Sequence, residues 1–148
     1  MSENFKVVVV GILQKEGKLL LVQEGEEHKY GKWNFPGGCL NAFESLHDGL
    51  RRELLEETGF EVKPGKLFQI IRHKGYQGDD ATLFLFHAEI IGGDGKVQDS
   101  EILGWDWMSP HDIQQSPALV YPHVKECVAR LAMKSPPLIL DLFESGQP

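Results

Sequence analysis

The sequence predicts an α/β domain in which helices cover a mixed β-sheet, and the pattern and order of its elements support this. Apolar segments rich in Val, Leu and Phe, such as Phe5–Gln14 and Ala81–Ile91, are typical of buried strands. Between them, Leu46, Leu50 and Leu54 recur every four residues, which is the spacing of a helical face that packs on a sheet. Strands, a helix, further strands and a second helix follow one another, and this order favours layers of helix and sheet.

The first part of the chain predicts a hairpin followed by a short extended piece. Phe5–Gln14 and Leu19–Gln23 are apolar and flank a polar turn, so they are predicted to pair as strands. The polar segment 24–32 is a predicted loop. Trp33–Pro36 is a predicted extended piece, which ends at Pro36 because proline cannot donate a hydrogen bond to a neighbouring strand. Gly37–Gly38 then allows backbone conformations that are closed to other residues.

The first long helix is predicted from Glu44 or Ser45 to Thr58, with Gly59 as its C-cap. Three later segments have strand-like patterns: Leu67–Ile71, Ala81–Ile91 and Ile102–Met108. The Gly-bearing segment 73–80 between two of them is a predicted loop.

Two further helices are predicted near the C-terminus. Ser109 and Pro110 have the residue types of an N-cap and a first helical position, so they begin a short helix. Tyr121–Met133 is a predicted second long helix. The apolar tail Leu138–Phe143 either covers the domain's own core or contacts a second subunit in a homodimer.

Size and charge limit the possible partners. The chain has 148 residues, 41% of them hydrophobic, and a net charge of −7, so we expect a single domain spanning residues 1–148. The negative charge argues against nucleic-acid polymers and acidic membranes, because both are polyanions. Cys39 and Cys127 show no zinc or disulfide spacing, and the N-terminus resembles neither a signal peptide nor a membrane span. We therefore expect a cytoplasmic protein.

Three glutamates in the first long helix form the main chemical signal. Glu53, Glu56 and Glu57 stand at positions i, i+3 and i+4, so their carboxylates project from one helical face. On the helical wheel this face borders the leucine line, which places the carboxylates at the edge of the packed surface. Like charges at this spacing destabilise an isolated helix, whereas Mg²⁺ binds oxygen ligands of this kind together with substrate phosphates. The simpler alternative is a solvated acidic face.

A longer pattern surrounds these carboxylates. Its residues stand at fixed spacing: Gly38, Glu44, Arg52, Glu53, Leu54, Glu56, Glu57, Gly59 and Phe60. The pattern resembles the Nudix box, and Trp33–Gly38 is similar to the segment that precedes the box in this family. Phe43 is a departure, because many members have glycine immediately before the first box glutamate.

The resemblance implies an α/β/α sandwich that hydrolyses a nucleoside diphosphate linked to another group. Carried over to this sequence, it implies four ligands for Mg²⁺ or Mn²⁺: the Gly38 carbonyl, Glu53, Glu56 and Glu57. Arg52 resembles the residue that orients a box carboxylate, and Glu44 resembles its structural partner near the start of the helix.

The chemistry of a pyrophosphate bond agrees with a metal-dependent hydrolase. Such a bond is anionic and repels hydroxide, whereas metal ions neutralise the phosphate oxygens and lower the pKa of bound water. A nearby glutamate can accept the proton of this water. Glu57 and Glu101, which precedes the strand Ile102–Met108, are the two candidates for this base.

Several residues outside the box are candidate substrate contacts. Trp33 and Phe35 can stack on a base, although such aromatic residues more often belong to the core. Arg72 and His73 precede a Gly-rich loop and can reach phosphates, with a charged strand end as the alternative. The remaining histidines with no ligand spacing are interpreted as structural: His47, His87, His111 and His123.

The box does not select the substrate. The size of the chain and the Trp33–Gly38 segment favour a mutator-type hydrolase that converts a nucleoside triphosphate to the monophosphate and pyrophosphate. ADP-ribose, other nucleotide sugars and dinucleoside polyphosphates stay open as substrates. A nucleotide-sensing module without turnover is the alternative from a different functional class, and the complete set of box glutamates argues against it.

Overall fold

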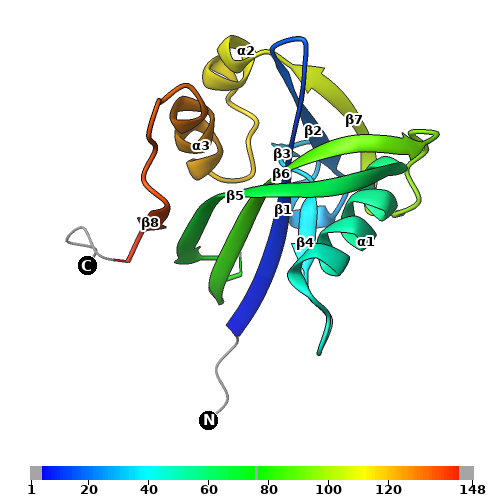
Figure 1. Ribbon diagram of the computed structural model, residues 1–148, viewed down its shortest axis with the longest axis horizontal. Helices are drawn as coiled ribbons and strands as arrows, with labels where there is room; N and C mark the ends of the chain where they lie inside the picture. Colours follow the sequence, from blue (N-terminus) through cyan, green and yellow to red (C-terminus); the bar gives the residue numbers. More distant parts are fainter. Residues whose placement is uncertain (1–4, 76, 144–148) are drawn as a thin grey trace.

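The computed structural model describes residues 5–75 and 77–143, and a mixed β-sheet forms its middle layer (Figure 1). Helix α1 (Leu46–Thr58) packs on one face of the sheet, and α2 (Pro110–Gln115) and α3 (His123–Leu131) pack on the other. This architecture confirms the predicted α/β class. In the part of the chain that the structure describes, no helix is long and apolar enough to cross a membrane.

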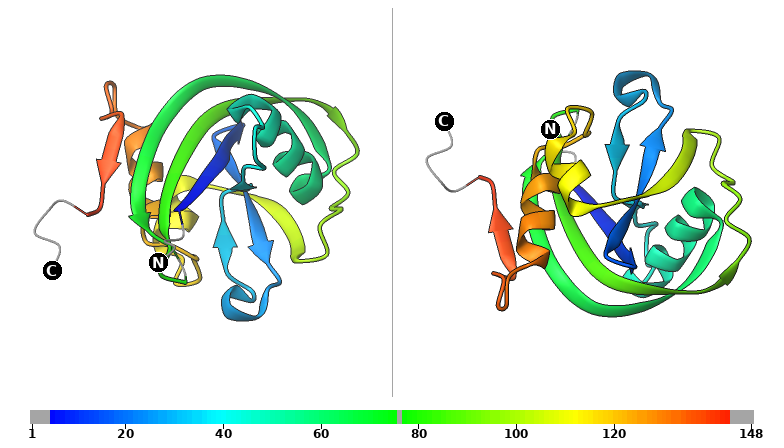
Figure 2. Two further views of the ribbon diagram at one scale, coloured as in Figure 1. Left: turned by 90° about the horizontal axis from the view of Figure 1, so that it is seen from below. Right: turned by 90° about the horizontal axis from the view of Figure 1, so that it is seen from above.

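The strands are β1 (Phe5–Lys15), β2 (Lys18–Glu24), β3 (Trp33–Asn34), β4 (Gly37–Cys39), β5 (Phe60–Lys74), β6 (Asp80–Gly93), β7 (Ile102–Met108) and β8 (Ile139–Asp141). Their order in the sheet is β3-β2-β1-β6-β5-β8, with β4 paired to β1 and β7 paired to β2. The β1–β6 and β5–β8 pairs are parallel and the others are antiparallel. Figure 2 shows β5 and β6 as long curved strands that pass α3 at one end and α1 at the other.

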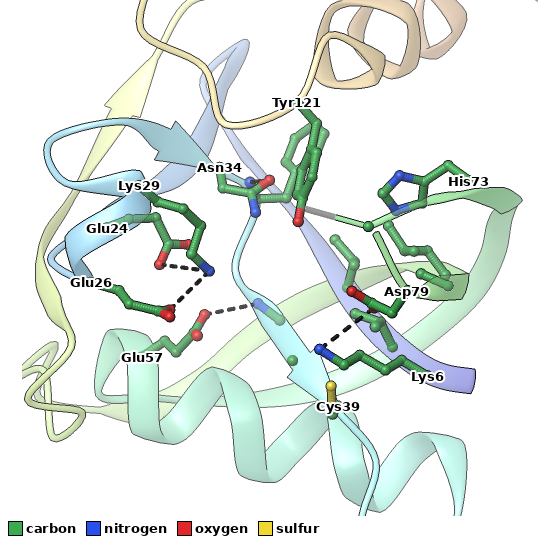
Figure 3. Close-up of a pocket in the computed structure, with 18 of the residues that line it drawn as sticks. Lys6, Glu24, Glu26, Lys29, Asn34, Cys39, Glu57, His73, Asp79 and Tyr121 are labelled. Atoms are coloured by element: carbon green, nitrogen blue, oxygen red, sulfur yellow. Dashed lines mark hydrogen bonds and ion pairs between the residues drawn. The ribbon is translucent and has the colours of Figure 1, made fainter. Parts of the chain in front are cut away.

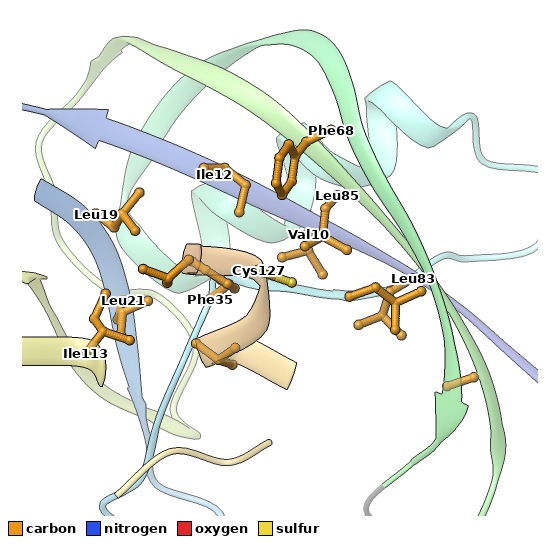
Figure 4. Packing of buried hydrophobic residues seen from close by; sticks show 14 residues of the cluster. Val10, Ile12, Leu19, Leu21, Phe35, Phe68, Leu83, Leu85, Ile113 and Cys127 are labelled. Atoms are coloured by element: carbon orange, nitrogen blue, oxygen red, sulfur yellow. The ribbon is translucent and has the colours of Figure 1, made fainter. Parts of the chain in front are cut away.

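Strand β1 is buried on both faces, which explains its unbroken apolar sequence. Val10 and Ile12 pack in the cluster beneath α2 and α3, part of which is drawn in Figure 4. Val9 and Leu13 point to the other side and pack with the leucines of α1. A Cβ added at Gly11 would lie 2.5 Å from a Leu54 methyl carbon, so glycine at this position lets α1 lie close to β1.

Both ends of α1 are defined by local sequence. Ser45 is the N-cap and its hydroxyl accepts a hydrogen bond from the Asp48 N–H at 3.1 Å. Gly59 is the C-cap with φ 78°, a left-handed conformation that favours glycine. Phe43 also has a positive φ of 64° and is exposed. The chain therefore keeps a left-handed turn before Glu44, although it has no glycine there.

The structure corrects several sequence-based boundaries. Gly37–Cys39 forms β4, which pairs with Val8–Val10 of β1. The sequence did not predict this strand, because its pairing partner is distant along the chain. Helix α3 begins at His123, two residues later than predicted, because the residue before Pro122 is disfavoured in helical conformation. Strand β5 extends through Lys74, into the predicted loop.

The C-terminal tail adds a strand to the domain's own sheet. Strand β8 pairs in parallel with Ile70–Arg72 of β5. Leu140 and Leu142 pack against the cluster beneath α3, whereas Ile139 is exposed. The tail thus covers the chain's own core, which is one of the two alternatives that the sequence left open.

Candidate active site

Arg52 on α1 connects three separate segments at the edge of the sheet. Its Nε and Nη2 atoms donate to the two carboxylate oxygens of Glu44, at 2.8 and 2.9 Å. Nη1 donates to Glu53 at 2.9 Å, and Nη2 also donates to the Cys39 carbonyl at 3.0 Å. The hydrogen bonds from Arg52 lower the pKa of Glu44 to about 2. A planar, five-donor guanidinium can satisfy all these acceptors at once.

Glu53 lies directly against β4. A Cβ added at Gly38 would be 2.4 Å from a Glu53 carboxylate oxygen, so only glycine leaves room for this carboxylate. Burial raises the pKa of Glu53, against the opposing effect of Arg52. Glu56 is more accessible, with 42% of its side chain exposed, and its Oε1 lies 3.5 Å from Arg52 Nη1.

Glu57 is the most buried of the three box carboxylates, with 7% of the residue exposed. Its Oε1 accepts a hydrogen bond from the Gly37 N–H at 2.9 Å. Burial raises the pKa of Glu57 well above its ordinary value, and the negative charges of Glu24, Glu53 and Asp99 raise it further. The protein thus places a buried carboxylate among other acids, where a cation would relieve the unfavourable charge.

This donor set fits a divalent cation that also binds substrate phosphates. Among residues 5–75 and 77–143, no group of three or more His, Cys, Asp or Glu side chains is arranged to hold a metal ion by itself. Mg²⁺ is commonly held by one or two carboxylates, with waters and substrate phosphates as its other ligands, rather than by a cage made entirely of protein. The adjacent Glu53, Glu57 and Gly38 can supply the protein's share of these oxygen ligands.

A cleft of about 400 Å³ lies beside these residues (Figure 3). Acidic side chains line the end near α1: Glu24, Glu26, Glu57, Asp99 and Glu101. Aromatic rings line the other end: His73, Tyr121 and His123. Apolar side chains also line the cleft: Val8, Val10, Phe35, Ala81, Leu83 and Leu85. One end therefore suits a metal-bound phosphate chain and the other suits a flat organic ring.

Three of these acids, Glu24, Glu26 and Asp99, were not predicted from the sequence. Glu24 ends β2 and is 8% exposed, with Lys29 Nζ 3.7 Å from its Oε1. Burial raises the pKa of Glu24. Asp99 is held over the last turn of α1, because its N–H donates to the Glu56 carbonyl at 2.9 Å. Glu24 resembles an ordinary strand end and Asp99 an ordinary loop acid, so only the folded chain reveals their proximity to Glu57.

Glu101 lines the cleft and is exposed. Its N–H donates to the Asp99 carboxylate at 2.8 Å, and its carbonyl accepts from the Gly25 N–H at 2.7 Å. These two bonds hold the segment before β7 next to the end of β2. The predicted base candidates Glu57 and Glu101 therefore line the same cleft.

The aromatic end contains two buried histidines, His73 and His123, which are 5% and 6% exposed. Their ring centroids are 4.7 Å apart, and Tyr121 stacks on His123 with centroids 5.0 Å apart and planes 11° apart. Burial lowers the pKa of both histidines, that of His123 to about 3. His123, which the sequence predicts to be structural only, thus lines the cleft as a neutral ring.

The buried neutral state of His123 predicts a pH effect on stability. The unfolded chain protonates this histidine near pH 6.5, whereas the folded protein does so near pH 3, so acid favours unfolding between these values. Each unit by which the pH is lowered should therefore decrease the free energy of unfolding by up to about 1.4 kcal/mol through this group. Urea unfolding at pH 7, 6 and 5 tests it against His123→Gln, whose stability should depend less steeply on pH. Equal slopes would contradict the assignment.

The structure brings only some predicted substrate residues to the cleft. Phe35 and His73 line it. Trp33 pairs with Gln23 and packs on the core beneath α3, and it is not part of the lining. Arg72 is directed elsewhere as well, because it bonds to Asp80. Trp33 thus packs as a core side chain, which is the alternative that the sequence left open.

Three features of this site invite comparison with known families. Glu53 packs on Gly38, Arg52 donates to Glu53, and Glu57 is buried beside the cleft. The sequence pattern of the NUDIX domain family matches residues 4–131. The chain belongs to the Nudix hydrolase family. This result confirms the family that the sequence predicts.

Individual relatives show how far the similarity extends. Phosphatase NudJ of Escherichia coli (strain K12) is 34% identical over 126 residues, which cover 82% of this chain and 80% of NudJ. The 8-oxo-dGDP phosphatase NUDT18 of Danio rerio is 34% identical over 118 residues, or 72% of this chain and 35% of NUDT18. The chain spans about a third of the length of NUDT18 and of curated relatives from Caenorhabditis elegans and Arabidopsis thaliana.

Solved structures share the fold of this Nudix chain. A NUDIX hydrolase from Nitrosomonas europaea is 29% identical, with a TM-score of 0.77, and the match covers 86% of this chain and 87% of that one. The similarity therefore extends over most of both chains.

Proposed function

We propose that this Nudix hydrolase cleaves a phosphoric anhydride bond of a small nucleotide in a reaction that depends on Mg²⁺ or Mn²⁺. The observation that carries the proposal is the environment of Glu57, a buried carboxylate with acidic neighbours at the edge of a cleft. The finer proposal is hydrolysis of a nucleoside triphosphate to the monophosphate and pyrophosphate.

The positions of these residues support the proposed roles. Glu53, Glu56, Glu57 and the Gly38 carbonyl would hold the cation. When bound, it supplies charge neutralisation of the phosphate oxygens and a water molecule of lowered pKa. Arg52 keeps Glu53 against Gly38 and thereby fixes a ligand in advance.

In the proposed reaction a water molecule would attack phosphorus, the anhydride P–O bond would break, and the leaving phosphate group would take the bonding electrons. Glu57 or Glu101 accepts the proton of the water. Glu101 is the more exposed of the two and lies at the acidic end of the cleft.

The names of the relatives favour a second product pattern. NudJ is named a phosphatase and NUDT18 an 8-oxo-dGDP phosphatase. A reaction of this kind would convert a nucleoside diphosphate to the monophosphate and inorganic phosphate at the same acidic end of the cleft. It needs the same attack by water, but its substrate has one phosphate fewer, so inorganic phosphate takes the place of pyrophosphate as the product.

The experiment is a nucleotide panel with product identification by ³¹P NMR. The panel contains nucleoside triphosphates, nucleoside diphosphates including 8-oxo-dGDP, ADP-ribose and a dinucleoside polyphosphate, each with Mg²⁺, Mn²⁺ or EDTA. Pyrophosphate as product supports the finer proposal, and phosphate supports the second. Turnover that persists in EDTA would refute the metal dependence, and tight binding without any turnover would support a nucleotide-sensing module.

Glu101→Gln distinguishes the two candidate bases. If Glu101 accepts the proton, we expect kcat to fall about 10²-fold or more, because general-base catalysis typically contributes this much. Glu89→Gln is the control, since Glu89 is exposed on β6 and does not line the cleft. A near-normal kcat in Glu101→Gln would return the role to Glu57 or another box residue.

A further inference from the structure

Asp79 is a carboxylate in the cleft that the proposed chemistry does not use. It precedes β6 and lies across the cleft from Glu57, on the side of His73 (Figure 3). Only 8% of its side chain is exposed, and its Oδ2 lies 3.5 Å from Lys6 Nζ. The Gly75 N–H donates to the Asp79 carbonyl at 2.7 Å, and a Cβ at Gly75 would be 2.7 Å from Oδ2. The carboxylate is therefore fixed in place before any ligand binds.

The surroundings of Asp79 suit a flat, largely apolar ring. Val8, Ala81 and Leu83 line the same part of the sheet and offer apolar contact. Tyr121 and His123 supply parallel aromatic rings on the side of α3. Aromatic faces of this kind stack on nucleobases. A ring bound here would have its phosphates directed along the cleft to the acidic end.

A carboxylate beside such a ring selects for hydrogen-bond donors. Its two oxygens accept two parallel N–H groups most strongly when these project side by side. A guanine-type base has this pattern, because a ring N–H stands next to an exocyclic amino group. Adenine and cytosine place a bare ring nitrogen next to the amino group, and uracil and thymine flank their N–H with carbonyl oxygens. Each of these other edges directs at least one acceptor at the carboxylate.

We propose that Asp79 determines base specificity by accepting two hydrogen bonds from the edge of a guanine-type base, on the premise that the substrate is a nucleotide as proposed above. Lys6 balances the charge of Asp79, so a neutral base meets an ion pair and not an isolated anion. The interaction binds the substrate away from the reacting phosphate and is made equally in the ground and transition states. Its loss should therefore raise KM and leave kcat nearly unchanged.

The test compares guanosine and inosine nucleotides, because inosine keeps the ring N–H and lacks the amino group. For the wild-type protein with Mg²⁺, we expect kcat/KM to be about 10-fold or more lower with the inosine nucleotide, since one hydrogen bond to a charged group is lost. For Asp79→Asn, we expect kcat/KM for the guanosine nucleotide to fall about 10- to 100-fold, and the preference over inosine to disappear. Hydrolysis of adenosine nucleotides should not fall, because the asparagine amide can donate to the ring nitrogen that faces the carboxylate in the wild-type protein.

Asp80→Asn is the matched control, because Asp80 is adjacent, bonds to Arg72 and does not line the cleft. It should retain the guanosine preference. An equal loss on every nucleotide in Asp79→Asn, or a wild-type protein that does not distinguish guanosine from inosine, would overturn the assignment of Asp79.

Binding of GDP, IDP and ADP, measured by calorimetry with Mg²⁺, separates this inference from the proposed function. Selective binding of GDP that is lost in Asp79→Asn supports the role of Asp79, whether or not the nucleotide is hydrolysed. If no nucleotide of the panel is hydrolysed, only the hydrolase proposal is refuted. Hydrolysis without base preference refutes only the role of Asp79.

Discussion

Glu57→Gln is expected to abolish hydrolysis and, in the absence of metal, to stabilise the fold. The substitution removes a ligand of the proposed cation, and metal charge contributes several kcal/mol to such reactions, so the rate should fall on the order of 10³-fold or more. The glutamine oxygen can still accept the Gly37 N–H bond. Because burial and neighbouring acids raise the pKa of Glu57, its ionised form destabilises the folded state at neutral pH. Removing that charge should add about 1 kcal/mol or more to the free energy of unfolding.

The measurements are kcat/KM with Mg²⁺ and urea unfolding in EDTA at pH 7.5. Glu56→Gln is the matched comparison on the same helix, since its side chain is 42% exposed and near Arg52. It should keep the fold and lose most activity without the gain in stability. A wild-type rate in either variant would contradict its assignment as a metal ligand, and an unchanged stability in Glu57→Gln would contradict the cost of its buried charge.

Arg52→Lys is expected to cause the second largest loss, although it preserves the charge. Arg52 holds Glu44 with two parallel bonds and reaches Glu53 and the Cys39 carbonyl from the same planar group. A lysine ammonium is a compact point charge and cannot reproduce this fork. Glu53 would then be free to leave Gly38, so we expect kcat to fall about 10²-fold, because misplaced groups can cost that much. The melting temperature should fall as well.

Arg51→Lys is the control for this substitution. Arg51 is the preceding residue, 51% of its side chain is exposed, and its bond is to Asp48 on the helix surface. Exposed pairs of this kind contribute little to stability, so both the rate and the melting temperature should stay near wild type. A normal rate for Arg52→Lys, measured as kcat at saturating Mg²⁺, would remove the orienting role from Arg52.

The sequence predicted those features that depend on near neighbours along the chain. The caps Gly59 and Ser109 and the buried Leu50 and Leu54 follow from local pattern and helical geometry. The placement of Glu57 at the edge of the packed face follows from the same helical spacing.

The rest depends on contacts between distant segments. Glu24 and Asp99 reach Glu57 only because β2 and the segment before β7 pack beside α1. His123 lines the cleft because α3 crosses the opposite face of the sheet. Strands β4 and β8 are too short to show a period, and their register is fixed by β1 and β5. No local pattern carries this information.

The parallel pairing of β1 with β6 also bears on how the protein folds and how long it stays folded. It joins Phe5 to Asp80, so the centre of the sheet requires closure of a long loop that encloses α1 and all four box glutamates. Closing such a loop is entropically costly, and distant pairings of this kind slow folding. The acidic side chains converge only when that closure is complete, and their repulsion then opposes the last step. The proposed divalent cation, if it binds only the assembled site, would therefore slow unfolding and leave the folding rate unchanged, and the lifetime of the native state would then depend on the metal concentration.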